Sequence, residues 1–499
     1  MKKRLSALLL LLALLTSCSS TDPGRVETGT TGAETDTAPV SSAETEPETT
    51  DPRNIPDEVP ELNFNGESFR SIGQSSAKQD IYVAEESGEV LNDAIYARNR
   101  YVEERLGVVI APMEAVWYTA LSAQIKQCVN AGDDAYDLVL GQMAQSGSDA
   151  LGGIYQNWYN IEHMDFEKPW YPKSVTNDSA SINGRMYTIV SDMLISFASN
   201  TWAIVYDKVE ADNFNLGNLY EKVYAGEWTL DYLLELCSTV YTDLNGDGVR
   251  DEGDMYAFSS ASQDGCLMAA FLYGSEVKFA VLGEQQIDVT LNSEKTVSVF
   301  EKLHRLFYES QGVWDTGTAY VSNNGAVNRV LTDRFLDGKT VFCNTTVGYV
   351  GSGMREYEND YGLLPIPKYD EEQKEYYTVT DAGCNIMAVP VTAKKNSMIG
   401  AVTECLAAES YRSVMPVYYD LTLGTKGVRD AESSLMMDYI LQSRQIDFAY
   451  MYDGSGGWLF KTSTFIENPG KFASGYEKYE KAVKNYYNKV LSFFYKAEE

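Results

Sequence analysis

The residues best spaced for chemistry form an acidic, glycine-containing loop between residues 243 and 254. Oxygen-bearing side chains recur there at alternate positions, as in the EF-hand calcium loop, and Gly248 allows the sharp turn between them. The last position holds Asp instead of the usual Glu, and the alternative is an Asx-rich turn without metal. Because hard oxygen ligands suit calcium, we expect one structural Ca²⁺. Its ligands would be Asp243, Asn245, Asp247, Val249 through its carbonyl group, Asp251 and Asp254.

Motifs of catalytic chemistry are absent from the sequence. There is no G-x-S-x-G, P-loop, H-E-x-x-H or glycine-rich dinucleotide fingerprint. Six cysteines besides Cys18 show no C-x-x-C spacing, which argues against a zinc or redox site and favours buried free thiols over disulfides. The sequence does not exclude a carboxylate pair of the glycosidase type, because the two residues of such a pair are brought together only by the fold. We therefore predict that the protein is not an enzyme.

The first 18 residues have the pattern of a lipoprotein export signal. Three basic residues precede an apolar run that ends at Leu15 and is shorter than the ~20 residues a membrane-spanning helix needs. The run leads into L-T-S-C, which resembles the bacterial lipobox, where the cysteine becomes the lipidated N-terminus. We expect a signal peptide over residues 1–17 and lipidation of Cys18. The chain would then be exported and anchored to the outer face of the cell membrane through lipid alone.

Residues 18–60 have the composition of a disordered acidic tether. Residues 19–60 contain no aromatic side chain and carry ten acidic and two basic residues. Such a segment buries too little apolar surface to offset the conformational entropy lost on folding. A long tether suits a thick wall outside a single membrane, which favours a Gram-positive source. The formal net charge of −32 argues against nucleic-acid binding, which depends on Lys and Arg.

After residue 60, short apolar strands alternate with amphipathic helices, and this pattern predicts α/β lobes. The remaining length exceeds one ordinary hydrophobic core, so we expect more than one domain. Residues 136–141 form one predicted strand. Ligands of open α/β sheets lie beyond the carboxyl ends of the strands, and Gln142 therefore becomes a candidate ligand contact. Thr229 is a predicted N-cap of a helix that follows Trp228.

Six short motifs follow one another between about residues 64 and 470. They are Y-D-L-V at 136–139, I-N-G-R-M-Y at 182–187, V-Y-D-K at 205–208, W-T at 228–229, F-L-D-G-K at 335–339 and Y-G-L-L-P-I-P-K at 361–368. In this order they resemble extracellular solute-binding protein family 1, whose best-known members bind maltose and other oligosaccharides. Asp207 replaces the Asn of the family's Y-N-K motif, and Val190 precedes Ser191 where many members have a proline. These departures leave the expected fold unchanged and weaken the sugar assignment.

The resemblance implies an α/β, two-lobe periplasmic-binding-protein-like type II fold with a hinge and an interlobe ligand cleft. The first lobe would comprise residues 61–195 and 345–410, and the second lobe residues 196–344 and 411–499. By analogy with the family, Tyr349 and Trp458 would provide aromatic ligand contacts, and the carboxylate of Asp381 would accept hydroxyl donors. Trp117 and Trp202 complete the candidate ligand contacts.

The same resemblance implies a function in uptake. We expect a monomeric substrate-binding lipoprotein that captures a small solute by hinge closure and delivers it to the permease subunits of an ABC importer. An oligosaccharide is the favoured solute, and peptides are an alternative class of solute. The alternatives are a surface glycan-capture adhesin without a transporter and a lipid-anchored glycosidase.

Overall fold

Two β-sheets organise the part of the chain that the computed structural model describes, namely residues 53–315, 327–354, 357–423, 431–446, 448–452 and 461–496. The smaller sheet has the strand order β14-β5-β2-β4, and the larger has the order β11-β8-β12-β6-β13, with β7 beside β8. The four-stranded sheet contains β2 (Ser71–Gln74), β4 (Glu114–Val116), β5 (Leu138–Gln142) and β14 (Asn385–Ala388). The six-stranded sheet contains β6 (Trp202–Asp207), β7 (Tyr241–Thr242), β8 (Met255–Ser260), β11 (Val313–Asp315), β12 (Thr340–Thr346) and β13 (Tyr361–Leu364).

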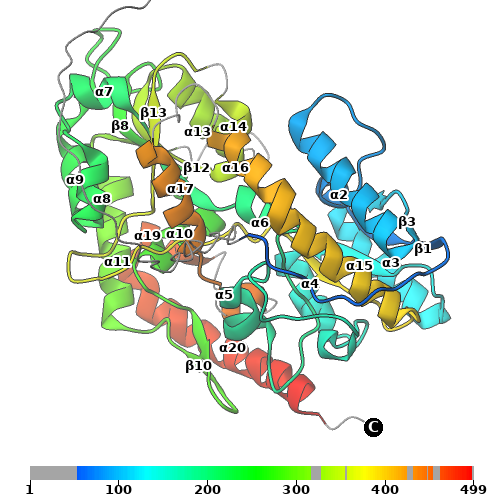
Figure 1. Ribbon diagram of the computed structural model, residues 1–499. Coiled ribbons are helices and arrows are strands. Elements are labelled where there is room, and N and C mark those ends of the chain that lie inside the picture. Colours follow the sequence, from blue (N-terminus) through cyan, green and yellow to red (C-terminus); the bar gives the residue numbers. More distant parts are fainter. Residues whose placement is uncertain are drawn as a thin grey trace, which may run out of the picture. The chain divides into compact units, whose positions relative to one another are not determined.

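The helices α3 and α4 pack on strands of the four-stranded sheet, and α2 and α15 lie beside the β1–β3 pair (Figure 1). In chain order, the bounds of these four helices are Val90–Leu106, Tyr118–Ala131, Met143–Ala150 and Asn396–Glu409, and the strand pair comprises β1 (Glu67–Phe69) and β3 (Val108–Ile110). Gly107 ends α2 with φ at 60°, the left-handed conformation that glycine adopts without steric cost. This first lobe therefore has the alternating strand and helix order that the sequence predicted.

A second group of helices accompanies the six-stranded sheet. It includes α7 (Lys208–Asn213), α8 (Leu219–Tyr224), α9 (Leu230–Thr239), α10 (Gly265–Gly274), α11 (Glu294–His304), α13 (Val327–Leu336) and α17 (Ala431–Gln442). The side chain of Thr229 accepts a hydrogen bond from the backbone N–H of Tyr232, which confirms the predicted N-cap of α9. A small antiparallel pair, β9 (Ala280–Leu282) and β10 (Ile287–Val289), lies between α10 and α11 in the chain.

The chain passes between the two sheets more than once. The short helix α6 (Ile195–Ser199) leads from the first sheet into β6, and residues 365–384 lead back to β14. Thr201 and Thr380 pair as a β-bridge where these two crossings meet. We expected the chain to return to the first lobe at residue 345. Instead, β13 pairs antiparallel with β6 in the larger sheet, and the chain rejoins the smaller sheet at β14. Sequence alone does not reveal this because β13 and β14 are both short apolar strands.

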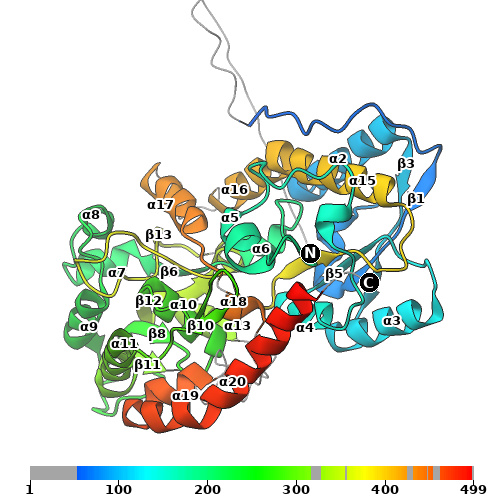
Figure 2. The ribbon, with the colours of Figure 1, turned by 90° about the horizontal axis from the view of Figure 1, so that it is seen from below.

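The C-terminal helix α20 (Phe472–Tyr495) reaches both sets of elements. At its start, the ring of Phe472 lies 5.1 Å from that of Phe300 on α11. At its end, Asn183 donates to the carbonyl of Phe494 at 3.1 Å, and the Phe493 ring lies 5.1 Å from Tyr187. Figure 2 shows α20 running from α19 (Thr462–Glu467) towards α4. The final helix, which we expected to belong to the second lobe, therefore also contacts the first.

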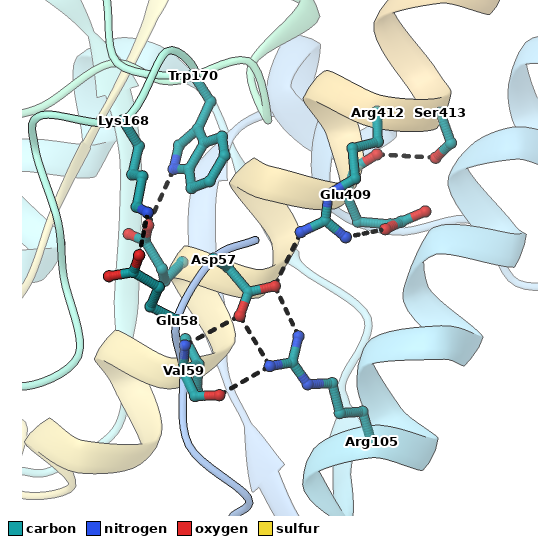
Figure 3. Close-up of polar contacts among 10 residues, drawn as sticks. Asp57, Glu58, Val59, Arg105, Lys168, Trp170, Glu409, Arg412 and Ser413 are labelled. Atoms are coloured by element: carbon teal, nitrogen blue, oxygen red, sulfur yellow. Dashed lines mark hydrogen bonds and ion pairs between the residues drawn. The ribbon is translucent and has the colours of Figure 1, made fainter. Parts of the chain in front are cut away.

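A buried ion-pair cluster holds the N-terminal segment against the first lobe (Figure 3). The Asp57 carboxylate is 5% exposed and accepts hydrogen bonds from Arg105 on α2 and from Arg412, which follows α15. Beside it, Lys168 forms an ion pair with Glu58 at 3.0 Å. We expected the tether to continue to residue 60, and this expectation is wrong for its last residues. Their composition is that of a tether, but Asp57 binds Arg105 and Arg412, two cationic residues that lie far away in the sequence.

Candidate functional site

The carboxyl ends of three first-lobe strands meet at one edge of the sheet. Strand β2 runs parallel to both β4 and β5, so Gln74, Val116 and Gln142 end their strands on the same side. Strand β14 is antiparallel to β5 and begins at Asn385, opposite Gln142. In open α/β sheets this edge is where ligands bind. The structure therefore places Gln142 at the carboxyl edge of the sheet, the position from which the sequence analysis proposed it as a ligand contact.

A cavity of about 220 Å³ opens next to this edge. Part of its wall comes from residues after β2 and from the start of α2, and part from the crossing segment around α6. The lining residues are Ser76, Gln79, Asp80, Leu91, Asn92, Ile95, Ile195, Ser196, Ser199, Asn200 and Gly383. The wall therefore joins first-lobe residues to residues of the crossing segment.

Asp80 is the central polar group of this cavity. The side-chain amide of Asn385 donates to Asp80 Oδ2 at 3.0 Å, and Arg98 donates to the Asp80 backbone carbonyl at 2.8 Å. The backbone N–H of Asn385 donates to Ser196 Oγ at 3.1 Å, which ties β14 to α6. Burial raises the pKa of Asp80 to about 7, against the opposing effects of Asn385 and of the Arg98 charge. No sequence pattern identified Asp80, because its partners lie on distant segments.

Gln142 and Asp381, two of the predicted contacts, converge on Gly383. The N–H of Gly383 donates to Asp381 Oδ1 at 2.8 Å. A methyl group at Gly383 would lie 2.9 Å from that oxygen and 3.3 Å from Gln142 Nε2. Burial raises the pKa of the Asp381 carboxyl, and its neighbours Cys266 and Trp202 oppose that shift. The carboxyl and amide groups therefore form a small cluster that can accept and donate hydrogen bonds.

The predicted aromatic contacts differ in position and exposure. Trp117 follows β4 at the same sheet edge, is 68% exposed and lies 5.3 Å from the ring of Tyr118. Tyr349 is half-buried on α14 (Val347–Gly353), which follows β12. Trp202, by contrast, is 1% exposed at the start of β6 and presents no open face to a ligand in this conformation. Trp458 and Cys18 lie outside the described residues. Trp117 with Tyr118 is thus the exposed aromatic surface among the described candidates.

The second lobe adds a further carboxyl group near Asp381. Asp264 caps α10 by accepting from the N–H of Leu267 at 2.9 Å. Its pKa rises to about 6 because the side chain is buried and because the Asp381 charge lies close by. The sequence pattern of an N-cap before an apolar helix could have identified Asp264, although it would not have linked the residue to Asp381.

The predicted calcium loop folds as a series of tight turns. Asp243 accepts hydrogen bonds from the N–H groups of Gly246 and Gly248 at 2.6 and 2.8 Å. Asp254 is fully buried and accepts from the hydroxyl of Tyr241 at 2.7 Å through Oδ2, whereas its Oδ1 has no hydrogen-bond partner among the described residues. That oxygen fits a cation ligand. Over the described residues, no group of three acidic, His or Cys side chains is positioned to hold a metal ion. The carboxylates would therefore have to turn inwards to bind calcium.

All six cysteines after Cys18 are free thiols, as the sequence favoured.

Within the described residues, no helix is both long and apolar enough to cross a membrane.

Neither a family model nor a curated protein matches this chain. Solved structures do match it. UspC from M. tuberculosis aligns with a TM-score of 0.54 and 14% identity, covering 84% of this chain and 100% of that one. Maltose-binding periplasmic protein from Listeria monocytogenes, in complex with maltose, aligns with a TM-score of 0.52 and 16% identity, covering 87% and 99%. An ABC substrate-binding protein from the same organism, in complex with cycloalternan, gives 0.51 and 11%, covering 86% and 98%.

These similarities extend over most of this chain and nearly all of each matched chain. Because the sequence identities are low, the similarities establish the fold alone. The chain has the two-lobe α/β fold of maltose-binding-type periplasmic binding proteins. The fold class predicted from the sequence is confirmed.

Proposed function

We propose that this protein is a substrate-binding lipoprotein that captures an oligosaccharide between its two lobes and delivers it to an ABC importer. The observation that carries the proposal is the position of the polar cluster around Gly383. It lies at the carboxyl edge of the first sheet and beside the crossing segments of a maltose-binding-type fold.

The chemistry of the site suits a neutral, hydroxyl-rich ligand. Asp381 and Gln142 offer carboxyl and amide groups to hydroxyls, and the exposed ring of Trp117 offers an apolar face to a sugar ring. Two of the similar structures hold maltose and cycloalternan, which are sugars. The protein would bind its ligand as a monomer without converting it, which separates the proposal from the glycosidase alternative.

Delivery requires that the permease distinguish the liganded receptor from the empty one. A ligand that contacts both lobes stabilises the closed form by its difference in affinity for the closed and open forms. The lipid on Cys18 and the acidic segment that follows would keep the receptor on the outer face of the cell membrane. An adhesin would need neither closure nor a permease.

A binding panel tests this function. Purified protein is titrated calorimetrically with maltose, maltotriose, maltotetraose, cycloalternan and a mixture of short peptides, and each ligand is recovered for mass analysis. Binding of an intact oligosaccharide with Kd at or below about 10 µM is the expected result, equivalent to about −7 kcal/mol. Binding of peptides alone, or recovery of shortened glycans, would overturn it. Closure on binding is read by small-angle scattering, and a receptor whose radius of gyration stays constant would favour the adhesin.

We further propose that the loop from Asp243 to Asp254 binds one calcium ion with a structural role. The unpartnered Asp254 Oδ1 and the alternating oxygen side chains support this proposal. The ion would join the end of β7 to the start of β8, at the opposite end of β8 from Ser260.

A further inference from the structure

A second cavity, of about 420 Å³, shares no residue with the one beside Gly383. Its wall is built from four stretches of chain: the residues before and within α5 (Lys173–Val175), the start of the first crossing, the helices after α15, and the end of α17. The lining residues are Pro169, Pro172, Lys173, Ser174, Asp192, Tyr411, Tyr419, Asp438, Leu441, Gln442, Arg444 and Gln445.

This cavity lies between parts that belong to different sheets. Trp170 lies between the lining residues Pro169 and Pro172 and donates a hydrogen bond to Glu404 of α15 at 3.0 Å. This part of the wall therefore belongs to the first lobe. Helix α17 packs on β13 of the larger sheet. Arg444 sits between them, because it forms a β-bridge with Thr378 of one crossing and donates to the Phe197 carbonyl of another at 3.0 Å.

Arg444 is held in place and provides a fixed positive charge. Its Nε donates to the Leu441 carbonyl at 2.6 Å, and its guanidinium lies 4.4 Å from the centre of the Phe197 ring. Its charge acts on Asp192 and Tyr419 from nearby, yet over the described residues no ion pair joins it to Asp192. The guanidinium therefore contributes a positive charge to the wall of the cavity.

Several half-buried polar groups of the wall lack a partner among the described residues. The carboxylate of Asp192, the hydroxyl of Tyr419 and the side-chain amide of Gln445 make no hydrogen bond there. Polar groups that are largely removed from water are normally hydrogen-bonded to protein, water or a ligand. These three can accept and donate hydrogen bonds, and the aromatic rings of Tyr411 and Tyr419 add apolar surface.

We propose that this cavity is a second ligand site, which takes one neutral polyhydroxylated molecule of monosaccharide size. The charges of Lys173 and Arg444 oppose those of Asp192 and Asp438, so the wall does not demand a charged ligand. The volume falls within the range of about 300–1,000 Å³ typical of small-molecule sites. Because the occupant would contact both lobes at the crossing segments, its binding and that of a ligand in the cleft would change each other's affinity by the same factor. The proposal does not depend on the identity of the cleft ligand.

The test uses purified full-length protein and equilibrium titration with D-glucose, D-galactose, D-xylose and myo-inositol, and with glycine betaine as a zwitterionic comparison. We expect at least one of the four polyols to bind. Tyr419→Phe and Gln445→Ala should each weaken that binding tenfold or more, whereas Gly470→Ala, whose added methyl group has nothing within 4 Å, should change it less than twofold. Tyr419→Phe removes a single oxygen atom, and its unfolding curve should coincide with that of the wild type.

Three results would overturn the proposal. The first is that no polyol binds the wild-type protein, and the second is that betaine binds in preference to all four. The third is that Gly383→Ala abolishes the binding of the polyol while Tyr419→Phe leaves its affinity unchanged. That polyol would then bind beside Gly383 and not in the second cavity. The oligosaccharide titration described above is scored separately, so either proposal can fail alone.

Discussion

Arg105 donates two hydrogen bonds to Asp57, from Nη1 to Oδ2 at 2.7 Å and from Nη2 to Oδ1 at 2.8 Å. This paired geometry is the strong form of an arginine–carboxylate contact. Arg412 adds a third hydrogen bond at 2.9 Å. Burial alone would raise the pKa of Asp57, but the hydrogen bonds from Arg105, Arg412 and the Val59 N–H hold it at about 2. The segment that contains Asp57 is thereby fixed to α2 and to the helix after α15.

Replacement of Asp57 should therefore destabilise the fold. We expect Asp57→Asn to lower the free energy of unfolding by about 2–3 kcal/mol, because two partly buried guanidinium groups lose their counter-charge. Urea unfolding at pH 7 measures the change. Glu61→Gln, at an exposed position in the same segment, should change stability by less than about 0.5 kcal/mol.

Acid should reproduce the effect of that substitution. The folded-state pKa of about 2 lies below the ordinary 3.8, so the contribution of Asp57 is present above pH 4 and is lost as the pH falls through 2. Wild type and Asp57→Asn should accordingly converge in stability between pH 4 and pH 2. Parallel curves over that range would show that Asp57 is not held by its charge.

Glu404 predicts a pH dependence of the opposite sign. Its oxygens accept hydrogen bonds from Trp170 at 3.0 Å and Tyr171 at 2.6 Å, and burial raises its pKa to about 8. Because the pKa is raised above 4.5, the stabilising contribution is full below pH 4.5 and is lost as the pH rises to 8. The loss amounts to up to about 1.4 kcal/mol per pH unit within that window.

Glu404→Gln should flatten the curve, because glutamine keeps one acceptor and one hydrogen-bonding amide and does not ionise. We expect the variant to match or exceed wild-type stability at pH 8 and to lose its advantage near pH 5. Thermal unfolding in matched buffers measures this, with the exposed Glu85→Gln as control. An unchanged slope between pH 5 and 8 would contradict the prediction.

The cluster around Gly383 should control affinity for the cleft ligand. Gly383→Ala places a methyl group against Asp381 Oδ1 and Gln142 Nε2, so we expect the Kd of the oligosaccharide to rise about tenfold, which is about 1.4 kcal/mol. Gly470→Ala is the matched control, since nothing lies within 4 Å of its added methyl group. Equal Kd values for both variants would remove Asp381 and Gln142 from the binding site.

Calcium should stabilise the protein through the loop that begins at Asp243. We expect millimolar CaCl₂ to raise the Tm of chelator-treated protein, because a ligand that binds only the folded state shifts the folding equilibrium. Asp247→Ala should abolish that rise, whereas Asp212→Ala, at an exposed position outside the loop, should retain it. A wild-type Tm that does not respond to calcium would leave the loop as an Asx-rich turn.

Local patterns in the sequence determined much of this protein. The Thr229 cap, the Gly107 helix end and the strand leading into Gln142 follow from interactions between residues close together in the chain, and the structure has all three. The order of short motifs predicted the two-lobe fold, which the similar structures confirm. Gln142, Asp381 and Trp117 were proposed from strand ends and family resemblance, and the structure places them at the carboxyl edge of the first sheet or beside Gly383.

Only the tertiary structure decided which distant groups meet. Asp57 lies 355 positions from Arg412, and Asp80 lies 305 positions from Asn385, yet each pair shares a hydrogen bond. Periodicity and capping report on a few neighbouring residues, so they carry no information about such pairs. The same limit explains why Trp202 was predicted as a ligand contact although it is buried, and why β13 was assigned to the first lobe. Burial and strand pairing depend on what the rest of the chain places alongside.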